Sequence, residues 1–275
     1  MSKKLKIAII SSKGGVGKST ISMQFINPYL FKKNNQQTIA HYEFDDENSD
    51  SLSFGASILS TREQISVESP LLREELASIF SKDETMCLDV GGNKTTMTVI
   101  EALNDSGMIN FLDLVVIPIL DGEQDGINAS YTYSVLKGYN KNLKFLFVLN
   151  RAKDINYIKY QFENYFGDVR GIFKDTYSIS KNLFEEDKNN YIAMLDDDII
   201  KYSRRFGLSI YEIANLNKDF ISELENLITE RSAEQEIKLV SFKNYIANSA
   251  KKYEQDVLQP AFHKINTILD GEKND

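Results

Sequence analysis

The sequence predicts an α/β protein with a mostly parallel, twisted sheet, helices on both of its faces, and a C-terminal helical extension. Two observations carry this prediction. Short apolar runs alternate with amphipathic stretches through residues 1–180, which is typical of strand–helix–strand units and therefore of a parallel sheet. After about residue 185 the β-branched clusters stop and helical spacing takes over. The tail is therefore expected to be helical.

Five apolar runs predict the strands, and the last three are almost continuously apolar, as in strands that are buried on both faces. These runs cover residues 5–10, 38–44, 85–89, 114–118 and 143–149. Between and after them, helical spacing covers residues 19–33, 70–81, 94–105, 123–138 and 154–166. Each strand is thus followed by a helix that can return the chain to the same end of the sheet.

The C-terminal third predicts further helices over residues 191–205, 209–214 and 218–268, with Pro260 breaking or kinking the last one. No repeat and no Pro/Gly-rich linker separates this part from the rest. We therefore predict an α/β core over residues 1–185 and a helical region over residues 186–275 that packs on it.

Composition excludes several classes of protein. Of 275 residues, 42% are hydrophobic and 26% are charged, an ordinary globular balance, and the formal net charge is −8. Such an acidic chain is not expected to coat nucleic acid with its whole surface, although a local basic patch remains open. Cys87 is the only cysteine, and His41 and His263 are the only histidines. One chain therefore builds no disulfide framework and no Cys-rich metal centre.

The sequence also gives expectations for the compartment. The apolar run after the basic N-terminus is too short for a signal peptide, and no run reaches 18 apolar residues. We expect a cytoplasmic protein of a reducing compartment that does not use the membrane.

The strongest motif is Ser-Ser-Lys-Gly-Gly-Val-Gly-Lys-Ser-Thr at residues 11–20, between the first predicted strand and the first predicted helix. Glycines in such a loop let successive backbone N–H groups turn inward around phosphate oxygens, and the following helix presents its positive end to the same anion. The residues expected to form this cradle are Gly14, Gly15, Val16 and Gly17.

Three side chains after the cradle have the matching chemistry. Lys18 can reach the β- and γ-phosphates, the Ser19 hydroxyl can ligate Mg²⁺, and Thr20 can bond the α-phosphate. The usual phosphate-loop pattern has a glycine where this chain has Ser12, and here a second lysine, Lys13, precedes the glycine pair. The alternative interpretation is a glycine-rich turn with two exposed lysines.

The segment Lys13–Thr20 resembles the deviant Walker A motif of the ParA/MinD family of ATPases. The resemblance implies a P-loop NTPase-like fold that uses ATP and Mg²⁺. It also implies that Lys13 crosses a nucleotide-sandwiched homodimer to touch the partner's phosphates. This role is like that of an arginine finger, which can be worth roughly 10³–10⁵-fold in rate. Hydrolysis would then depend on dimerisation.

Two acidic segments fit the same resemblance. In the first, Glu43 stands where the family usually has the first Asp of Asp-x-Asp, and Asp45 matches the second, which is expected to orient the lytic water. Whether Glu43 takes part stays open, and residues 45–50 could instead be a solvated acidic loop. In the second, residues 86–92 resemble Walker B and its switch loop. Asp89 would hold Mg²⁺ through water and the Gly91 N–H would sense the γ-phosphate, unless Asp89 is an ordinary strand-end residue.

Asn150 follows the fifth predicted strand in an Asn-Arg pair that is similar to the pair with which the family reads adenine. Asparagine is also a common turn residue at strand ends. Cys87 lies within a predicted strand and is interpreted as a small buried apolar residue rather than a nucleophile.

Other branches of the family fit less well. A single cysteine cannot share a cluster across a dimer, the acidic C-terminus does not resemble a membrane-docking helix, and no helix-turn-helix segment precedes the loop. The resemblance is therefore closest to short ParA-type plasmid partition ATPases, switches for plasmid or chromosome segregation. Alternatives are a conjugation or mobilisation accessory, a MinD-like positioning ATPase, and a non-catalytic nucleotide-binding module.

Partners follow from the same resemblance. We expect a homodimer on ATP, a small DNA-binding adaptor protein, and DNA bound without sequence preference. The candidate patch is Lys201, Arg204 and Arg205, which share one helical face. Nucleoid association would follow from it, and a solvated helix face is the equal alternative.

Overall fold

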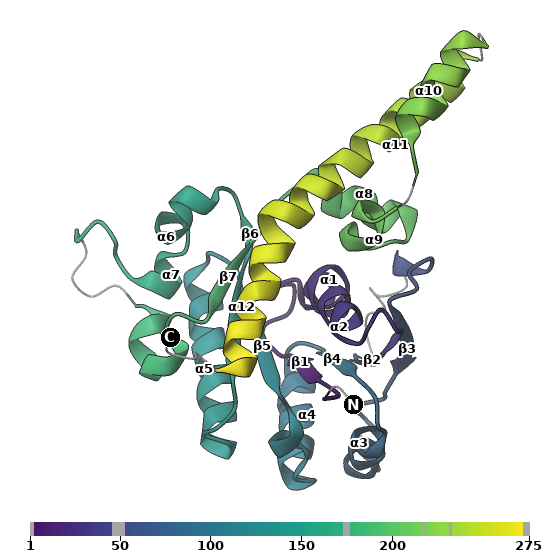
Figure 1. The fold of residues 1–275 in the computed structure, drawn as a ribbon. Helices are drawn as coiled ribbons and strands as arrows, with labels where there is room; N and C mark the ends of the chain where they lie inside the picture. The colour runs from purple at the N-terminus through teal and green to yellow at the C-terminus, as the bar shows by residue number, and fades with distance from the viewer. Residues whose placement is uncertain (1–2, 46–52, 173–176, 217, 231–232, 272–275) are drawn as a thin grey trace.

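The computed structural model describes residues 3–45, 53–172, 177–216, 218–230 and 233–271. A seven-stranded sheet lies at its centre, with strand order β3-β2-β4-β1-β5-β6-β7 and parallel pairing throughout (Figure 1). The strands are β1 (Lys6–Ile9), β2 (Ile39–Phe44), β3 (Ser60–Gln64), β4 (Met86–Val90), β5 (Leu114–Ile119), β6 (Phe145–Ala152) and β7 (Tyr191–Leu195). The predicted α/β fold with a parallel sheet is confirmed.

The sheet differs from the prediction at its two edges. β3 was not predicted, because its sequence Ser-Thr-Arg-Glu-Gln carries no apolar run. The helix predicted over 191–205 is wrong in its first five residues, which form β7 and pair with β6. A run of five residues is too short for the spacing of its apolar side chains to distinguish a strand from a helix. Here the residues form a strand because they pair with the open edge of β6.

Helices cover both faces of the sheet. Those that follow strands along the chain are α1 (Lys18–Ile21), α2 (Asn27–Lys33), α3 (Leu72–Ser81), α4 (Lys94–Asp105), α5 (Glu123–Tyr139), α6 (Ile158–Gln161) and α7 (Glu163–Phe166). The C-terminal helices are α8 (Asp198–Phe206), α9 (Ile210–Ala214), α10 (Phe220–Thr229), α11 (Glu234–Tyr253) and α12 (Gln259–Asp270). The helix predicted over 154–166 is broken into short pieces, and the one predicted over 218–268 is a hairpin of α10 and α11 continuing into α12.

Two π-helical segments each stand shortly before a proline. Residues Ser22–Ile26 join α1 to α2 before Pro28, and Glu254–Leu258 join α11 to α12 before Pro260. Proline has no N–H to donate and its ring crowds the carbonyl four residues back. A wider π turn accommodates both effects, so each helix passes its proline without ending.

Alternation along the strands divides the core into two layers. Ala8 and Ile10 face the layer under α3, α4 and α5, while Ile7 and Ile9 face the layer under α1, α2 and the C-terminal helices. The tail is part of the second layer: Phe25 stacks on Phe262 with ring centroids 5.8 Å apart.

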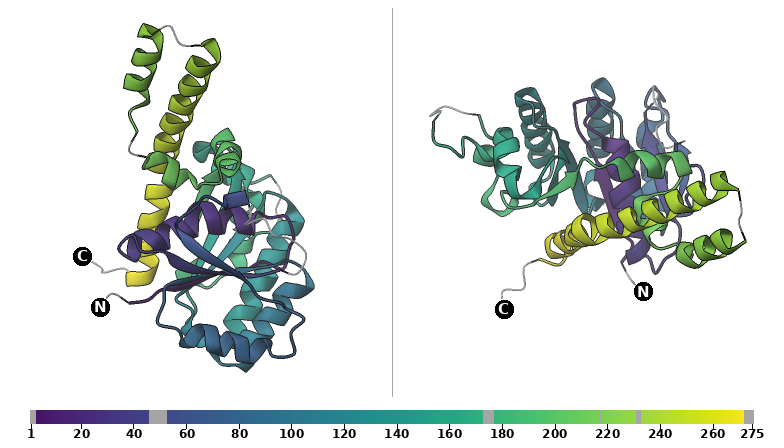
Figure 2. Two further views of the ribbon diagram at one scale, coloured as in Figure 1. Left: turned by 90° about the vertical axis from the view of Figure 1, so that its right-hand side faces the viewer. Right: turned by 90° about the horizontal axis from the view of Figure 1, so that it is seen from above.

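The helical hairpin of α10 and the first half of α11 leaves the core and projects outward (Figure 2). It has a small apolar cluster of its own, made by Phe220, Val240 and Ala247. None of the described helices combines the length and the apolar character needed to cross a bilayer.

His41 on β2 is fully buried and provides a test of the fold. Its Nδ1 lies 3.1 Å from the Asn27 side-chain nitrogen, and its Nε2 has no hydrogen-bond partner among the described residues. Burial, with a smaller contribution from the Arg62 charge, lowers the pKa of His41 to about 3. Below pH 6.5 the unfolded chain binds a proton at this position while the folded chain does not. Stability is therefore expected to fall with falling pH, by about 1.4 kcal/mol per pH unit from this group.

Urea denaturation at pH 7.5 and pH 5 measures this effect. His41→Asn retains a polar atom near the position of Nδ1 and should reduce the loss of stability between the two pH values by about 1–2 kcal/mol. His263→Asn, at the exposed histidine, is the matched control and should leave the loss unchanged. Equal losses in wild type and His41→Asn would show that His41 titrates normally.

Candidate nucleotide-binding site

The predicted phosphate loop connects β1 to α1 at the carboxyl edge of the sheet. β1, β4 and β2 are neighbours, so the ends of these parallel strands bring their following residues to the same edge. A cavity of about 670 Å³ opens there. The lining includes Gly14, Gly15, Gly17, Lys18, Ser19, Thr20, Asp45 and Gly92. The structure thus brings together most of the residues that the sequence singles out.

The loop is held in place by the end of β6. Asn150 is buried, its Nδ2 donates to the Val16 carbonyl at 2.8 Å, and its Oδ1 accepts from the Arg151 N–H at 3.0 Å. Gly17 has φ +88°, and a Cβ there would lie 2.3 Å from Asn150 Nδ2. Asn150 therefore acts as a support for the loop in this structure, next to a second cavity of about 790 Å³ that it also lines.

Lys18 lies buried on the floor of the phosphate cavity. Its Nζ donates to the Lys13 carbonyl at 3.0 Å. Burial lowers the pKa of Lys18, and the nearby charges of Asp89 and Asp45 oppose this shift. An ammonium group that has lost hydration in this way gains from a phosphate anion. The position fits the predicted contact with phosphate.

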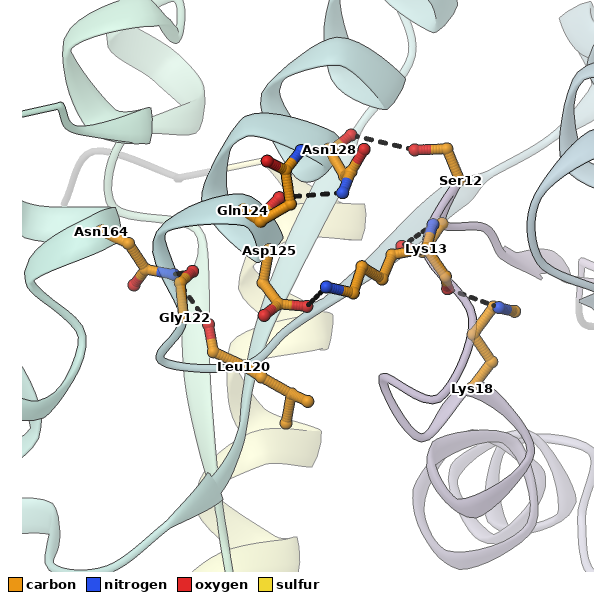
Figure 3. A network of polar contacts seen from close by, with 10 residues as sticks. Ser12, Lys13, Lys18, Leu120, Gly122, Gln124, Asp125, Asn128 and Asn164 are labelled. Carbon is orange, nitrogen blue, oxygen red and sulfur yellow. Dashed lines mark hydrogen bonds and ion pairs between the residues drawn. The ribbon is translucent and has the colours of Figure 1, made fainter.

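Lys13 points the other way. Its ammonium group lies 3.5 Å from Asp125 Oδ1 in the first turn of α5, while the backbone of the loop continues toward Lys18 (Figure 3). Lys13 is absent from the residues that line the phosphate cavity, and its side chain is 35% exposed. The neighbouring Ser12 fastens the loop to α5, because its hydroxyl donates to the Asn128 carbonyl at 3.3 Å.

Asp89 lies in β4 under the loop helix. The Ser22 hydroxyl donates to Asp89 Oδ2 at 2.8 Å. Burial raises the pKa of Asp89 to about 6, and Glu43, its neighbour across the β2–β4 pair, adds to the increase. Contacts with Ser22, Lys18 and Ser19 oppose it. The Asp89 carboxylate thus has the hydroxyls of Ser22 and Ser19 as partners and the Glu43 carboxylate nearby, and these groups form a set of hard oxygen donors.

This donor set fits a magnesium ion. No group of three or more His, Cys, Asp or Glu side chains that could hold a metal occurs within the described ranges. Mg²⁺ at nucleotide sites is typically bound through one or two carboxylates together with phosphates and waters. Ser19 and Asp89 satisfy that requirement, and the raised pKa of Asp89 marks a carboxylate that a cation would stabilise.

The glycine pair after β4 differs from the prediction in detail. The Gly91 N–H donates to the Phe44 carbonyl at 2.7 Å, so in this structure it serves the backbone between β2 and β4. Gly92 lines the cavity instead, and a Cβ there would come within 2.9 Å of the Gly14 Cα. Gly92 is not among the predicted site residues, although its position in the Gly-Gly pair was the available signal.

The acidic segment after β2 is only partly described. Asp45 lines the phosphate cavity, and its carbonyl accepts from Gln64 Nε2 at 2.6 Å. Residues 46–50 of the predicted acidic loop lie outside the described residues. Cys87 is fully buried and its pKa is raised by burial, as expected for an unreactive core residue.

The predicted basic patch divides on α8. Lys201 and Arg205 are exposed, whereas Arg204 turns toward the loop helix and its Nη2 donates to the Thr20 hydroxyl. α8 is capped at its N-terminus by Asp197, whose side chain accepts from the Ile199 N–H, and at its C-terminus by Gly207 in the left-handed region. This placement fixes which face of α8 meets Thr20. All three residues line a cavity of about 790 Å³, but Lys201 and Arg205 are exposed whereas Arg204 is half-buried against the loop helix.

No protein-family model and no curated protein matches the chain, but solved structures do. McdA from Cyanothece, in an ATP complex, is 13% identical over 78% of this chain and 91% of its own, with a TM-score of 0.47. A plasmid partition protein from Borrelia burgdorferi bound to AMPPNP is 17% identical over 82% and 97%, with a TM-score of 0.49.

A chain of the MinC:MinD cell division complex from Aquifex aeolicus is 14% identical over 75% of this chain and 87% of its own, with a TM-score of 0.48. These are proteins of the ParA/MinD group, whose motif the phosphate loop resembles. Because the identities lie below 25% and these TM-scores below 0.5, we infer no function from the likeness itself.

Proposed function

We propose that this protein is a Mg²⁺-dependent ATPase that dimerises on ATP and acts as a switch in plasmid or chromosome partition. The observation that carries the proposal is the phosphate cavity. Gly14, Gly15 and Gly17 of the loop, the buried Lys18 and Ser19 line one opening at the carboxyl edge of the sheet, and the buried Asp89 interacts with Lys18 and Ser19.

Each residue has a distinct part in the proposed reaction. The backbone of Gly14, Gly15, Val16 and Gly17 binds the phosphate oxygens, and Lys18 neutralises the β- and γ-phosphates. Thr20 bonds the α-phosphate and Asp45 orients the attacking water. Bound Mg²⁺, held by Ser19 and through water by Asp89, would offset the charge that develops on the phosphates. Gly91 would join the γ-phosphate only if its bond to Phe44 opens, and Asn150 would reach adenine with its remaining amide hydrogen.

Lys13 is proposed to act on the partner's nucleotide in the homodimer. Two features support this role: Lys13 does not line its own cavity, and its ammonium group is held 3.5 Å from Asp125. An ion pair with one part-exposed member is weak and can exchange for a phosphate. Dimerisation would then complete each site, and hydrolysis would dissolve the dimer.

The partners are proposed on the same basis. The ATP dimer would bind DNA without sequence preference and a small DNA-binding adaptor would stimulate turnover, in the cytoplasm and at the nucleoid. Lys201 and Arg205 remain available as DNA contacts, since both are exposed on α8.

Retention on DNA-coated beads over a salt series tests this function. Wild type with ATP is expected to bind DNA, and this binding should weaken steeply between about 50 and 200 mM salt. The steepness of the loss scales roughly with the number of DNA phosphates that the protein neutralises. With ADP, and for Lys13→Ala with ATP, retention should be absent. Equal retention with and without ATP would contradict a nucleotide-operated switch.

Glu43 favours a second candidate, a nucleotide-binding module without turnover. This residue is buried beside Asp89 and contributes to the raised pKa of the Asp89 carboxyl. Glu43 also stands where the family that the loop resembles usually has an aspartate, and its longer side chain places the carboxylate differently. A steady-state ATPase assay with and without DNA decides, because no phosphate release in either condition supports the binding module and excludes the enzyme.

A further inference from the structure

Arg204 extends from the C-terminal helices to the phosphate loop. Its Nη2 donates to the hydroxyl of Thr20, which is 184 positions away in the sequence. Arg204 lines both the 670 Å³ phosphate cavity and the neighbouring 790 Å³ cavity. Thr20 also lines both. The arginine therefore stands at the junction of the two cavities.

The guanidinium group of Arg204 has few partners within the protein. Its Nε is buried and has no hydrogen-bond partner among the described residues. Its Cζ lies 6.0 Å from the centre of the Phe54 ring, and it forms no ion pair with a described carboxylate. The two lysines of the phosphate loop do have carboxylate neighbours: Lys13 is paired with Asp125, and Lys18 lies beside Asp89 and Asp45.

A partly buried cation without a counter-ion is unfavourable unless a ligand supplies the negative charge. The guanidinium fork carries five donors in a plane and matches a phosphate group with two parallel bonds. Thr20, which Arg204 contacts, is the residue that the proposed function assigns to the α-phosphate. The uncompensated charge of Arg204, its contact with Thr20 and its place in the lining of both cavities therefore point to the same phosphate group.

We propose that Arg204 binds the α-phosphate of the nucleotide together with Thr20, an inference that rests on the proposed function. Arg204 then belongs to the nucleotide site and not to the DNA surface. Since α8 packs against α9 and α11, the same contact ties nucleotide occupancy to the C-terminal helices.

Titration calorimetry with ATP, ADP and adenosine tests the inference on four proteins: wild type, Arg204→Ala, Arg204→Lys and, as a control away from both cavities, Arg170→Ala. Arg204→Ala should bind ATP and ADP about 10- to 100-fold more weakly, by a similar factor for both because they share the α-phosphate. Its affinity for adenosine should equal that of wild type. Arg204→Lys should recover part of the loss, and Arg170→Ala, at an exposed arginine that lines neither cavity, should stay within about 2-fold of wild type.

The outcomes separate this inference from the proposed function. If Arg204→Ala binds ATP within about 2-fold of wild type, the inference is overturned. If that variant also loses DNA retention, Arg204 is a DNA contact instead. An equal loss for adenosine would overturn it too, since the arginine would then act on the shape of the site. Failure of wild type to bind ATP would instead refute the proposed function. Thermal unfolding of each apo protein checks that the variants are folded.

Discussion

Lys18→Met is expected to weaken ATP binding by at least about 100-fold, equivalent to about 2.7 kcal/mol. The ammonium group lies buried beside the loop with its Nζ 3.0 Å from the Lys13 carbonyl, so a bound phosphate would meet it without intervening water. Charged contacts of this kind gain most where water is excluded. Titration calorimetry of ATP measures the loss.

The methionine retains the packing of the lysine stem, so the variant isolates the charge. Burial lowers the pKa of Lys18, which means that burial disfavours the charged form of this side chain in the protein alone. The apo variant is therefore expected to unfold no earlier than wild type. Lys33→Met, at an exposed lysine of α2, is the matched control. An unchanged ATP affinity in Lys18→Met would refute the assignment of the phosphate loop.

Lys13→Ala is expected to bind ATP within a few-fold of wild type and to lose turnover by about 10³-fold or more, as for other cations supplied in trans. The reason is that its ammonium group is directed at Asp125 and lies outside its own phosphate cavity. Calorimetry and phosphate release measure the two quantities on the same sample.

Mixing variants sharpens this prediction. Lys13→Ala has an intact nucleotide site but offers no lysine to its partner, whereas Lys18→Met offers Lys13 but binds ATP at least about 100-fold more weakly. An equimolar mixture should therefore recover measurable turnover from sites made of both chains. Turnover of Lys13→Ala alone at the wild-type rate would show that Lys13 acts neither in trans nor in cis.

Much of the fold could be predicted because burial leaves a strong pattern. The strands with continuous apolar runs were found within a few residues, as in the case of Leu114–Ile119. The polar edge strand Ser60–Gln64 could not be found, since its side chains are mostly exposed and only pairing with β2 orders its backbone. The division at residue 185 stays a prediction, and β7 shows that the sheet itself continues beyond it.

The candidate site was predictable where its chemistry depends on residues that are adjacent in the sequence. Gly15 and Gly17 have the positive φ angles that a cradle needs, and the following Lys18 is placed by the helix that they start. Contacts between distant segments were not predictable. Arg204 was assigned to a basic surface because helical spacing places it beside Lys201 and Arg205, but spacing says nothing of the Thr20 hydroxyl that it meets.

The most direct measurement is the molar mass of the wild-type protein in solution with Mg²⁺ and a non-hydrolysable ATP analogue, by light scattering on a sizing column. The expected result is twice the 31.4 kDa of one chain with the analogue, and a single chain with ADP or for Lys13→Ala. A saturated protein that stays at 31.4 kDa would contradict a nucleotide that joins two copies and lets each complete the other's site.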